Sequence, residues 1–320
     1  MPPPSLSEIE AGVAIVHQHM RPTPEIAWPL LAERLGTRVV VKHENHTPIG
    51  AFKVRGGITY IDALRREMPE VPGVITATRG NHGQSVARAA VAAGLKATIY
   101  IPHGNSVEKN AAMRAFGAEL VEEGDDFQSC YEACVARAEA EGLHLLQSFH
   151  PWLLQGVASY GYELMTACPD LDVIYVPIGL GSGICSTIAV RDALGLKTEV
   201  VGVVSENAAA YALSFAAGKP VSTNSAETMA DGMACRVPVA EAVAIVNAGA
   251  ARVVQVSDAE IKVAMRAYYT DCHQVAEGAG AAPLAAALQE RGRLAGKTVG
   301  LVLSGGNVDR DVYAGVLGEG

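Results

Sequence analysis

Short apolar runs alternate with helix-length segments along most of this 320-residue chain. The runs are rich in β-branched residues and lie at 38–42, 74–78, 98–101, 119–121, 173–177, 200–204 and 299–303. Such runs are typical of parallel strands that are buried on both faces. Helical patterns lie between them, for example at 81–93, 107–116, 127–140, 182–194 and 258–269. We therefore predict an α/β protein with parallel-rich sheets and helices on both faces.

Composition limits the classes of protein to consider. The net charge is −9 and the basic residues are scattered, which argues against a nucleic-acid partner. The N-terminus lacks a basic segment followed by an apolar run, and no window approaches the ~18 apolar residues of a membrane span. We expect a cytoplasmic protein with no membrane partner. The six cysteines suggest neither a zinc site nor a disulfide framework. Cys130 and Cys134 share a helix face, where burial as small hydrophobes is favoured over metal binding.

Three glycine-rich loops follow apolar runs, at 78–83 (TRGNHG), 179–183 (GLGSG) and 304–307 (SGGN). Ligands of parallel sheets bind at the carboxyl ends of the strands, where such loops lie. One glycine alone more often marks a turn than a ligand site. Three loops in the same structural position predict a shared binding site.

Lys53 lies in a glycine-punctuated turn, HTPIGAFKVRGG, that leads into a predicted helix. A lysine amine becomes a nucleophile or base where burial lowers its pKa, and Ala51 and Phe52 provide apolar surroundings for that burial. The alternative is an ordinary solvated lysine.

The GLGSG loop opens a predicted helix, so its backbone amides and the helix dipole predict a phosphate site. A dinucleotide fingerprint is the rival interpretation, but Ile184 stands where a third small residue is required. Glu199, 20 residues after Gly179, would be its ribose ligand. A monophosphate beside a reactive lysine indicates pyridoxal phosphate. A nicotinamide-dependent oxidoreductase and a catalytically silent binding protein remain alternatives.

Seven strings, in order, carry a family resemblance that runs from end to end: KHENHTPIGAFKVRGG, TRGNHGQS, SVEKNAAMRAFGAEL, VPIGLGSG, ETMADG, EGAGA and LVLSGGNVD. The chain resembles the fold type II (tryptophan-synthase-β-like) pyridoxal-phosphate enzymes, in the serine/threonine dehydratase and serine racemase branch. The resemblance implies a large cofactor-binding domain (1–65 and 150–320), a small mobile domain (66–149) and a homodimer.

The resemblance also implies residue roles. Lys53 would form the Schiff base and take the substrate α-proton. The other expected cofactor-binding residues are Phe52, Asn81, Gly179, Leu180, Gly181, Ser182, Gly183, Glu277 and Ser304. Asn81 would bind the ring hydroxyl, and Ser304 would face the pyridine nitrogen. A neutral hydroxyl cannot keep that nitrogen protonated, so β-elimination is favoured over transamination.

Departures from the family pattern concern the substrate. Arg79 stands where the racemases have a serine that acts as a second acid or base, and a guanidinium does not release a proton at ordinary pH. Arg79 would bind a substrate carboxylate or pair with a protein acid. Gly80 and His82 are further expected substrate-binding residues. Phe149 and Trp152 would either line an apolar pocket or pack the domain junction.

The cation site of the racemase branch is incomplete in this sequence. Glu206 and the Ala210 carbonyl match it, but Ala212 replaces the expected acid, so a Mg²⁺ site is doubtful and a monovalent cation remains open. The resemblance implies a dehydratase that converts a β-hydroxy-α-amino acid to a 2-oxo acid and ammonia. Threonine, serine, 3-hydroxyaspartate and 3-phenylserine are the open substrates, and a racemase is the alternative activity. Because the chain ends soon after the SGGN loop, we expect no regulatory domain.

Overall fold

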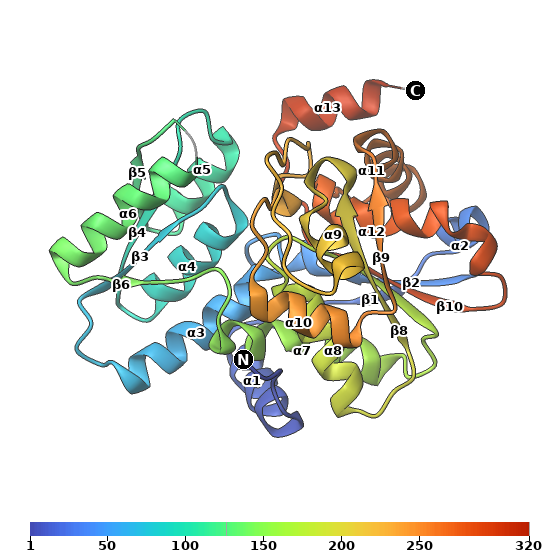
Figure 1. The fold of residues 1–320 in the computed structure, drawn as a ribbon, viewed down its shortest axis with the longest axis horizontal. Coiled ribbons are helices and arrows are strands. Elements are labelled where there is room, and N and C mark those ends of the chain that lie inside the picture. The colour runs from blue at the N-terminus through green and yellow to red at the C-terminus, as the bar shows by residue number, and fades with distance from the viewer. Residues whose placement is uncertain (126, 320) are drawn as a thin grey trace.

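The computed structural model describes residues 1–125 and 127–319, which form two sheets surrounded by helices (Figure 1). The six-stranded sheet has the order β1-β2-β10-β7-β8-β9, and the four-stranded sheet has the order β5-β4-β3-β6. β1 pairs antiparallel with β2, and the other strand pairs are parallel. The strands are β1 (Glu25–Ala27), β2 (Arg38–His43), β3 (Gly73–Ala77), β4 (Lys96–Ile101), β5 (Glu119–Glu122), β6 (His144–Leu145), β7 (Val173–Pro177), β8 (Glu199–Ser205), β9 (Arg252–Val256) and β10 (Thr298–Leu303).

Helices lie on both sides of the sheets. They are α1 (Leu6–His19), α2 (Pro29–Leu35), α3 (Lys53–Glu67), α4 (Asn81–Ala92), α5 (Val107–Ala115), α6 (Phe127–Glu141), α7 (Pro151–Ala167), α8 (Ser182–Ala193), α9 (Ala210–Ala217), α10 (Ala240–Gly249), α11 (Asp258–Cys272), α12 (Gly278–Gln289) and α13 (Arg310–Gly318). Across the described ranges, no helix combines the length and apolar character needed to cross a bilayer.

The seven predicted strands are all present, with ends within two residues of the prediction, and the α/β fold class is confirmed. Three strands were not predicted. β1 and β6 have three and two residues, too few for a hydrophobic period to be detected. β9 is an edge strand of the large sheet, and its Arg252 and Gln255 interrupt the apolar run.

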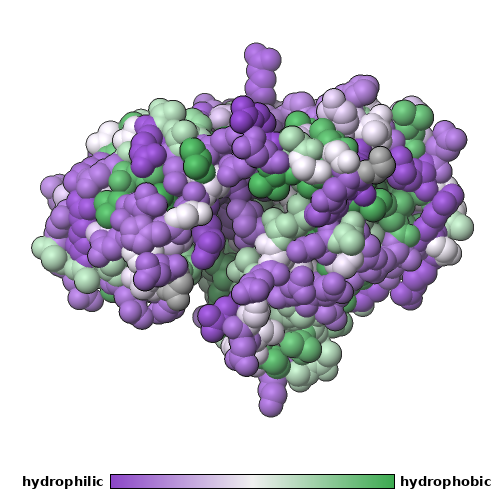
Figure 2. Space-filling view, turned by 90° about the horizontal axis from the view of Figure 1, so that it is seen from above, coloured by the Kyte–Doolittle hydropathy of each residue, from purple (hydrophilic) through white to green (hydrophobic). Residues whose placement is uncertain are grey.

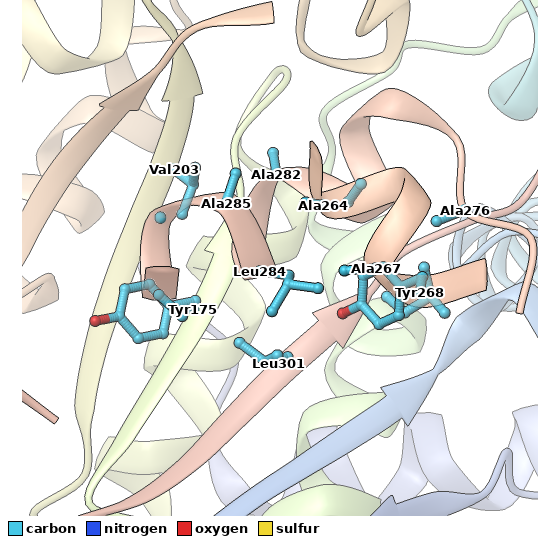
Figure 3. Close-up of a cluster of buried hydrophobic side chains, with 14 of the residues drawn as sticks. Tyr175, Val203, Ala264, Ala267, Tyr268, Ala276, Ala282, Leu284, Ala285 and Leu301 are labelled. Carbon is cyan, nitrogen blue, oxygen red and sulfur yellow. The ribbon is translucent and has the colours of Figure 1, made fainter. Parts of the chain in front are cut away.

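The central strands β7, β8 and β10 of the large sheet are buried on both faces, which explains their largely apolar sequences. In β7, Val173 and Tyr175 belong to one hydrophobic cluster, whereas Ile174 and Val176 belong to a second cluster. Figure 3 shows the first cluster, in which Leu284 of α12 lies among residues of α11, β7 and β10. The many alanines of α12 allow this helix to pack closely on the sheet. The sheet is thus a rigid base for the loops at its strand ends.

The four-stranded sheet uses residues between 73 and 145, inside the segment predicted as the small domain. It lies to one side of the large sheet in Figure 1, with α4, α5 and α6 packed around it, and α3 contacts both α4 and α7. Figure 2 shows a hollow on the face between the two parts. The domain boundaries and the mobility of the small part stay predictions.

Candidate active site

The turn that carries Lys53 is bound to the loop after β10. The Phe52 amide donates a hydrogen bond to the Ser304 carbonyl at 2.9 Å, and Ala51 forms an isolated β-bridge with Gly305. The Lys53 carbonyl accepts a hydrogen bond of 2.6 Å from the Ser85 hydroxyl of α4. The start of α3 is therefore held by the loop after β10 and by α4.

The Lys53 amine lies beside the glycine-rich loop at 179–183. Its Nζ donates to Ser182 Oγ at 3.3 Å and lies 5.1 Å from the centroid of the Phe52 ring. Burial lowers the pKa of Lys53 from 10.5 to about 8. About a tenth of the amine is then unprotonated at pH 7, compared with less than about a thousandth for an ordinary lysine, and the unprotonated amine is the form that acts as a nucleophile or base.

The glycines of the GLGSG loop are required by close packing. A Cβ at Gly179 would lie 2.3 Å from the Gly232 carbonyl oxygen. Gly181 has a φ of 96°, and its added Cβ would lie 2.8 Å from the Cβ of Ala242. The Leu180 carbonyl is fixed by a 2.8 Å hydrogen bond from the Tyr211 hydroxyl. The loop leads directly into α8, whose first amides have no helical carbonyl to bind, so this is a suitable anion site.

Asn81 lies at the N-terminus of α4 and contacts the large sheet's loops. Its Nδ2 donates to Glu277 Oε1 at 2.7 Å, and its Oδ1 accepts from Asn307 Nδ2 at 2.8 Å. Burial raises the pKa of Glu277 to about 7, although the nearby Lys109 ammonium opposes this rise. Lys109 Nζ in turn donates to Asp231 Oδ2 at 2.5 Å. These contacts join α4 and α5 to the large part.

His82 is a buried residue with an unused acceptor. Burial, and secondarily the Lys53 ammonium, lower the pKa of His82 to about 3, so the ring is neutral. The Leu146 carbonyl accepts a hydrogen bond from this ring, and no described residue bonds to its Nε2. A neutral imidazole held in this way presents Nε2 as a hydrogen-bond acceptor.

The other expected substrate residues are more dispersed. Arg79 is exposed, and none of the described carboxylates pairs with it. Gly80 lies against Lys109, because a Cβ there would be 2.5 Å from Lys109 Cδ. Phe149 is buried in the cluster that includes α7 and α8. The Trp152 ring packs edge-on to Tyr60, with centroids 5.2 Å apart, which supports the packing alternative for this residue.

The two groups that match part of the racemase cation site, Glu206 and the Ala210 carbonyl, are not arranged as metal ligands. Glu206 is exposed, and the Ala210 carbonyl accepts a 2.7 Å hydrogen bond from the Ser214 hydroxyl of its own helix. In the described part of the chain, no group of three or more His, Cys, Asp and Glu side chains could hold a metal ion. Cys130 and Cys134 are buried, and burial raises the pKa of Cys134 to about 12, which favours their interpretation as core residues.

The sequence prediction gave no role to Ser85, Lys109, Asp231 or Asn307. Lys109 and Asp231 occur in the quoted strings SVEKN and ETMADG, but their contact joins residues that are distant in the chain. Beside this contact lies a cavity of about 260 Å³, lined by Gln84, Glu108, Lys109, Ala112, Gly306, Asn307, Val308 and Asp309.

Comparison with known proteins identifies a matching family. A sequence model described as "Pyridoxal-phosphate dependent enzyme" matches residues 16–305. An L-threonine ammonia-lyase of Geobacter sulfurreducens is 35% identical over 309 residues, which cover 95% of this chain and 76% of that protein. An L-threo-3-hydroxyaspartate ammonia-lyase of Saccharomyces cerevisiae is 29% identical over 303 residues, covering 94% of this chain and 93% of that protein.

Solved structures give the same picture. A threonine deaminase from T.th. superimposes with a TM-score of 0.90 at 30% identity, covering 96% of this chain and 99% of that one. Maize serine racemase has a TM-score of 0.91 at 26% identity, covering 99% of this chain and 98% of that one. The site residues fit the cofactor in the family description, because an amine of lowered pKa adjoins a helix N-terminus that suits a phosphate.

Proposed function

The chain belongs to the pyridoxal-phosphate dependent enzyme family, and we propose that it is a dehydratase that converts a β-hydroxy-α-amino acid to a 2-oxo acid and ammonia. The observation that carries the proposal is the Lys53 amine, which lies 3.3 Å from Ser182 Oγ at the start of α8. The names of the similar ammonia-lyases support the same reaction class. The family match disfavours the nicotinamide-dependent and cofactor-free alternatives.

Each residue has a distinct task in this proposal. Bound pyridoxal phosphate supplies the electron sink that acidifies the substrate α-proton. The loop at 179–183 binds the phosphate, and Asn81 keeps one amide hydrogen for the ring hydroxyl beyond its bond to Glu277. Lys53 takes the α-proton, for which a pKa of about 8 is suitable at neutral pH. Ser304 offers a neutral hydroxyl to the ring nitrogen, which favours departure of the β-hydroxyl.

Racemisation is the second candidate activity, since the maize enzyme of similar structure is a serine racemase. Two-base racemisation requires an acid on the face opposite Lys53, and Arg79 replaces the serine expected there. A guanidinium does not exchange a proton at ordinary pH. Chiral chromatography after incubation with L-serine should therefore find pyruvate and ammonia but no D-serine. Accumulation of D-serine at the rate of ammonia release would favour the racemase.

The proposal has two extensions, to substrates whose side chains are larger than those of threonine and serine. If Arg79 binds a second carboxylate and the bound substrate buries the pair, Arg79→Ala should selectively weaken turnover of 3-hydroxyaspartate, by roughly the 2–5 kcal/mol of a truncated buried charge pair. If Phe149 and Trp152 form an apolar pocket, Trp152→Ala should affect 3-phenylserine far more than threonine. The exposed, unpaired guanidinium supports the first extension, and the packing of Trp152 against Tyr60 weakens the second.

The test is a panel of these four amino acids assayed for ammonia release with wild type and Lys53→Ala. We expect turnover of at least one substrate and a loss of at least ~10³ in Lys53→Ala, the scale for removal of a catalytic base. Lys96→Ala, at an exposed ion pair with Glu119, is the matched control and should retain full activity. Wild-type rates in Lys53→Ala would contradict the mechanism. The cytoplasmic location, the homodimer and a monovalent-cation requirement stay predictions.

A further inference from the structure

Arg55 lies on the opposite side of α3 from Lys53. Two residues along a helix correspond to a rotation of about 200°, so the two side chains point in opposite directions. Lys53 points toward Ser182 of α8, whereas Arg55 is fully buried behind the helix. The direction of Lys53 is therefore linked to the position of Arg55.

The guanidinium of Arg55 is bonded on all sides by buried acceptors. Nε and Nη2 donate to the two carboxylate oxygens of Glu44 at 2.7 and 2.9 Å. Nη1 and Nη2 donate to the two oxygens of Glu163 in α7 at 2.7 and 2.8 Å. Ser159 Oγ and Thr23 Oγ1 accept at 2.8 and 3.1 Å. Two bidentate carboxylates fix the plane of the group as well as its position.

The acceptors are themselves held by other elements. Lys42 of β2 donates to Glu163 Oε2 at 2.6 Å, and His17 of α1 bonds Glu163 Oε1 at 2.8 Å. Burial alone would raise the pKa of Glu163, but Arg55 and Lys42 hold it at about 2. The Arg55 network, defined as Arg55, Glu44, Glu163, Lys42 and His17, thus connects α3 to α1, β2 and α7.

The backbone adds a second restraint. A Cβ at Gly156 of α7 would lie 2.1 Å from the Arg55 carbonyl oxygen, so the two helices are in direct contact. The groups that face Lys53 itself are Phe52, Ser182 and His82, and burial is the cause of its lowered pKa. The network therefore acts on Lys53 through geometry.

We propose that Arg55 is a positioning residue, which fixes the rotation of α3 so that the Lys53 amine stays partly buried beside Ser182. The role of Lys53 in turnover rests on the proposed function, but its burial does not. Arg55→Lys keeps the charge but cannot form both bidentate pairs, because an ammonium is a compact point charge without the planar donor fork of a guanidinium.

The test measures the reactivity of Lys53 in the cofactor-free protein. Trace acetic anhydride labelling with peptide mass mapping across pH 6–11 gives the midpoint of the Lys53 amine, which should be near 8 in wild type. In Arg55→Lys the midpoint should rise by about one pH unit or more as the amine becomes exposed. In the holoenzyme, kcat should fall about 100-fold with a smaller change in KM, as for a misplacement of about 1 Å. Glu163→Gln, which weakens the same clamp while preserving its shape, should shift the midpoint in the same direction.

Arg252→Lys is the matched control. Arg252 also bonds two carboxylates, Glu290 at 2.6 Å and Glu199 at 2.6 Å, but it belongs to the edge strand β9. Its replacement should lower the melting temperature and leave the Lys53 midpoint unchanged. The proposal is wrong if Arg55→Lys folds and its Lys53 amine has the wild-type midpoint. If Arg55→Lys does not fold, a wild-type midpoint in folded Glu163→Gln would show the same. Failure of the proposed function would be a separate result, namely full turnover by Lys53→Ala.

Discussion

Burial of the Lys53 ammonium should destabilise the cofactor-free protein near neutral pH. The pKa is about 8 in the folded protein and 10.5 for an ordinary lysine. Each pH unit between two such values corresponds to about 1.4 kcal/mol, so the cost below pH 8 is about 3 kcal/mol. Lys53→Met removes the charge and keeps a side chain of similar shape. At pH 7 we expect this variant to have a higher free energy of unfolding than wild type by about 3 kcal/mol.

The pH dependence has a definite sign. Between pH 8 and 10.5 the unfolded chain binds a proton at Lys53 that the folded protein has released. Wild-type stability at this site therefore rises with pH across that window, and the advantage of Lys53→Met disappears. Because both proteins contain the same other groups, the difference between their stabilities isolates this effect.

Urea unfolding of the two cofactor-free proteins at a series of pH values from 7 to 10.5 measures the difference. Lys96→Met, at an exposed lysine, is the control and should remain within about 0.5 kcal/mol of wild type at pH 7. A stability difference between wild type and Lys53→Met that does not change between pH 7 and 10.5 would refute the reasoning. It would mean that the Lys53 ammonium is solvated in the folded protein.

Three further predictions concern single substitutions. Ser304→Asp should protonate the ring nitrogen of the bound cofactor, change the visible spectrum and slow ammonia release; an unchanged spectrum would show that the residue does not face the ring. Gly181→Ala should weaken cofactor retention on dialysis at least tenfold more than Gly195→Ala. Both glycines have a positive φ, but only at Gly181 would an added Cβ meet other atoms within 4 Å. Equal retention would argue against the loop as the phosphate site. Tyr268→Phe should leave the free energy of unfolding unchanged or raise it by about 1 kcal/mol, since no described residue bonds this buried hydroxyl (Figure 3). Tyr160→Phe loses a hydrogen bond to the Gly183 carbonyl and should lower the free energy of unfolding by about 1 kcal/mol in the same urea assay.

The fold was largely predictable because the central strands of its large sheet are buried on both faces. In β7 every residue from Val173 to Val176 is apolar, and such runs are visible without tertiary information. β1 and β6 were missed because they are defined by hydrogen bonds to longer neighbours and not by a period of their own. Strand order also had to come from the structure, since β10 lies between β2 and β7, which precede it in the chain.

The candidate site was predictable where it follows local chemistry. Lys53 and the loop at 179–183 are recognisable from their own neighbours in sequence, and the structure places the amine at the start of α8. The Lys109–Asp231 pair was not predictable, because 122 residues separate its members. Arg55 gave no signal either, since an arginine two residues into a helix ordinarily faces water, and only the packing of α3 on α7 buries it.

Covalent trapping of the cofactor tests the central claim most directly. The purified protein is treated with borohydride in the presence of pyridoxal phosphate, digested and mapped by mass spectrometry. A pyridoxyl adduct on the peptide that contains Lys53, and its loss in Lys53→Ala, is the result that we predict from the partly buried amine of lowered pKa beside Ser182. An adduct at a different lysine, or none on a protein that still releases ammonia from its substrate, would contradict the account.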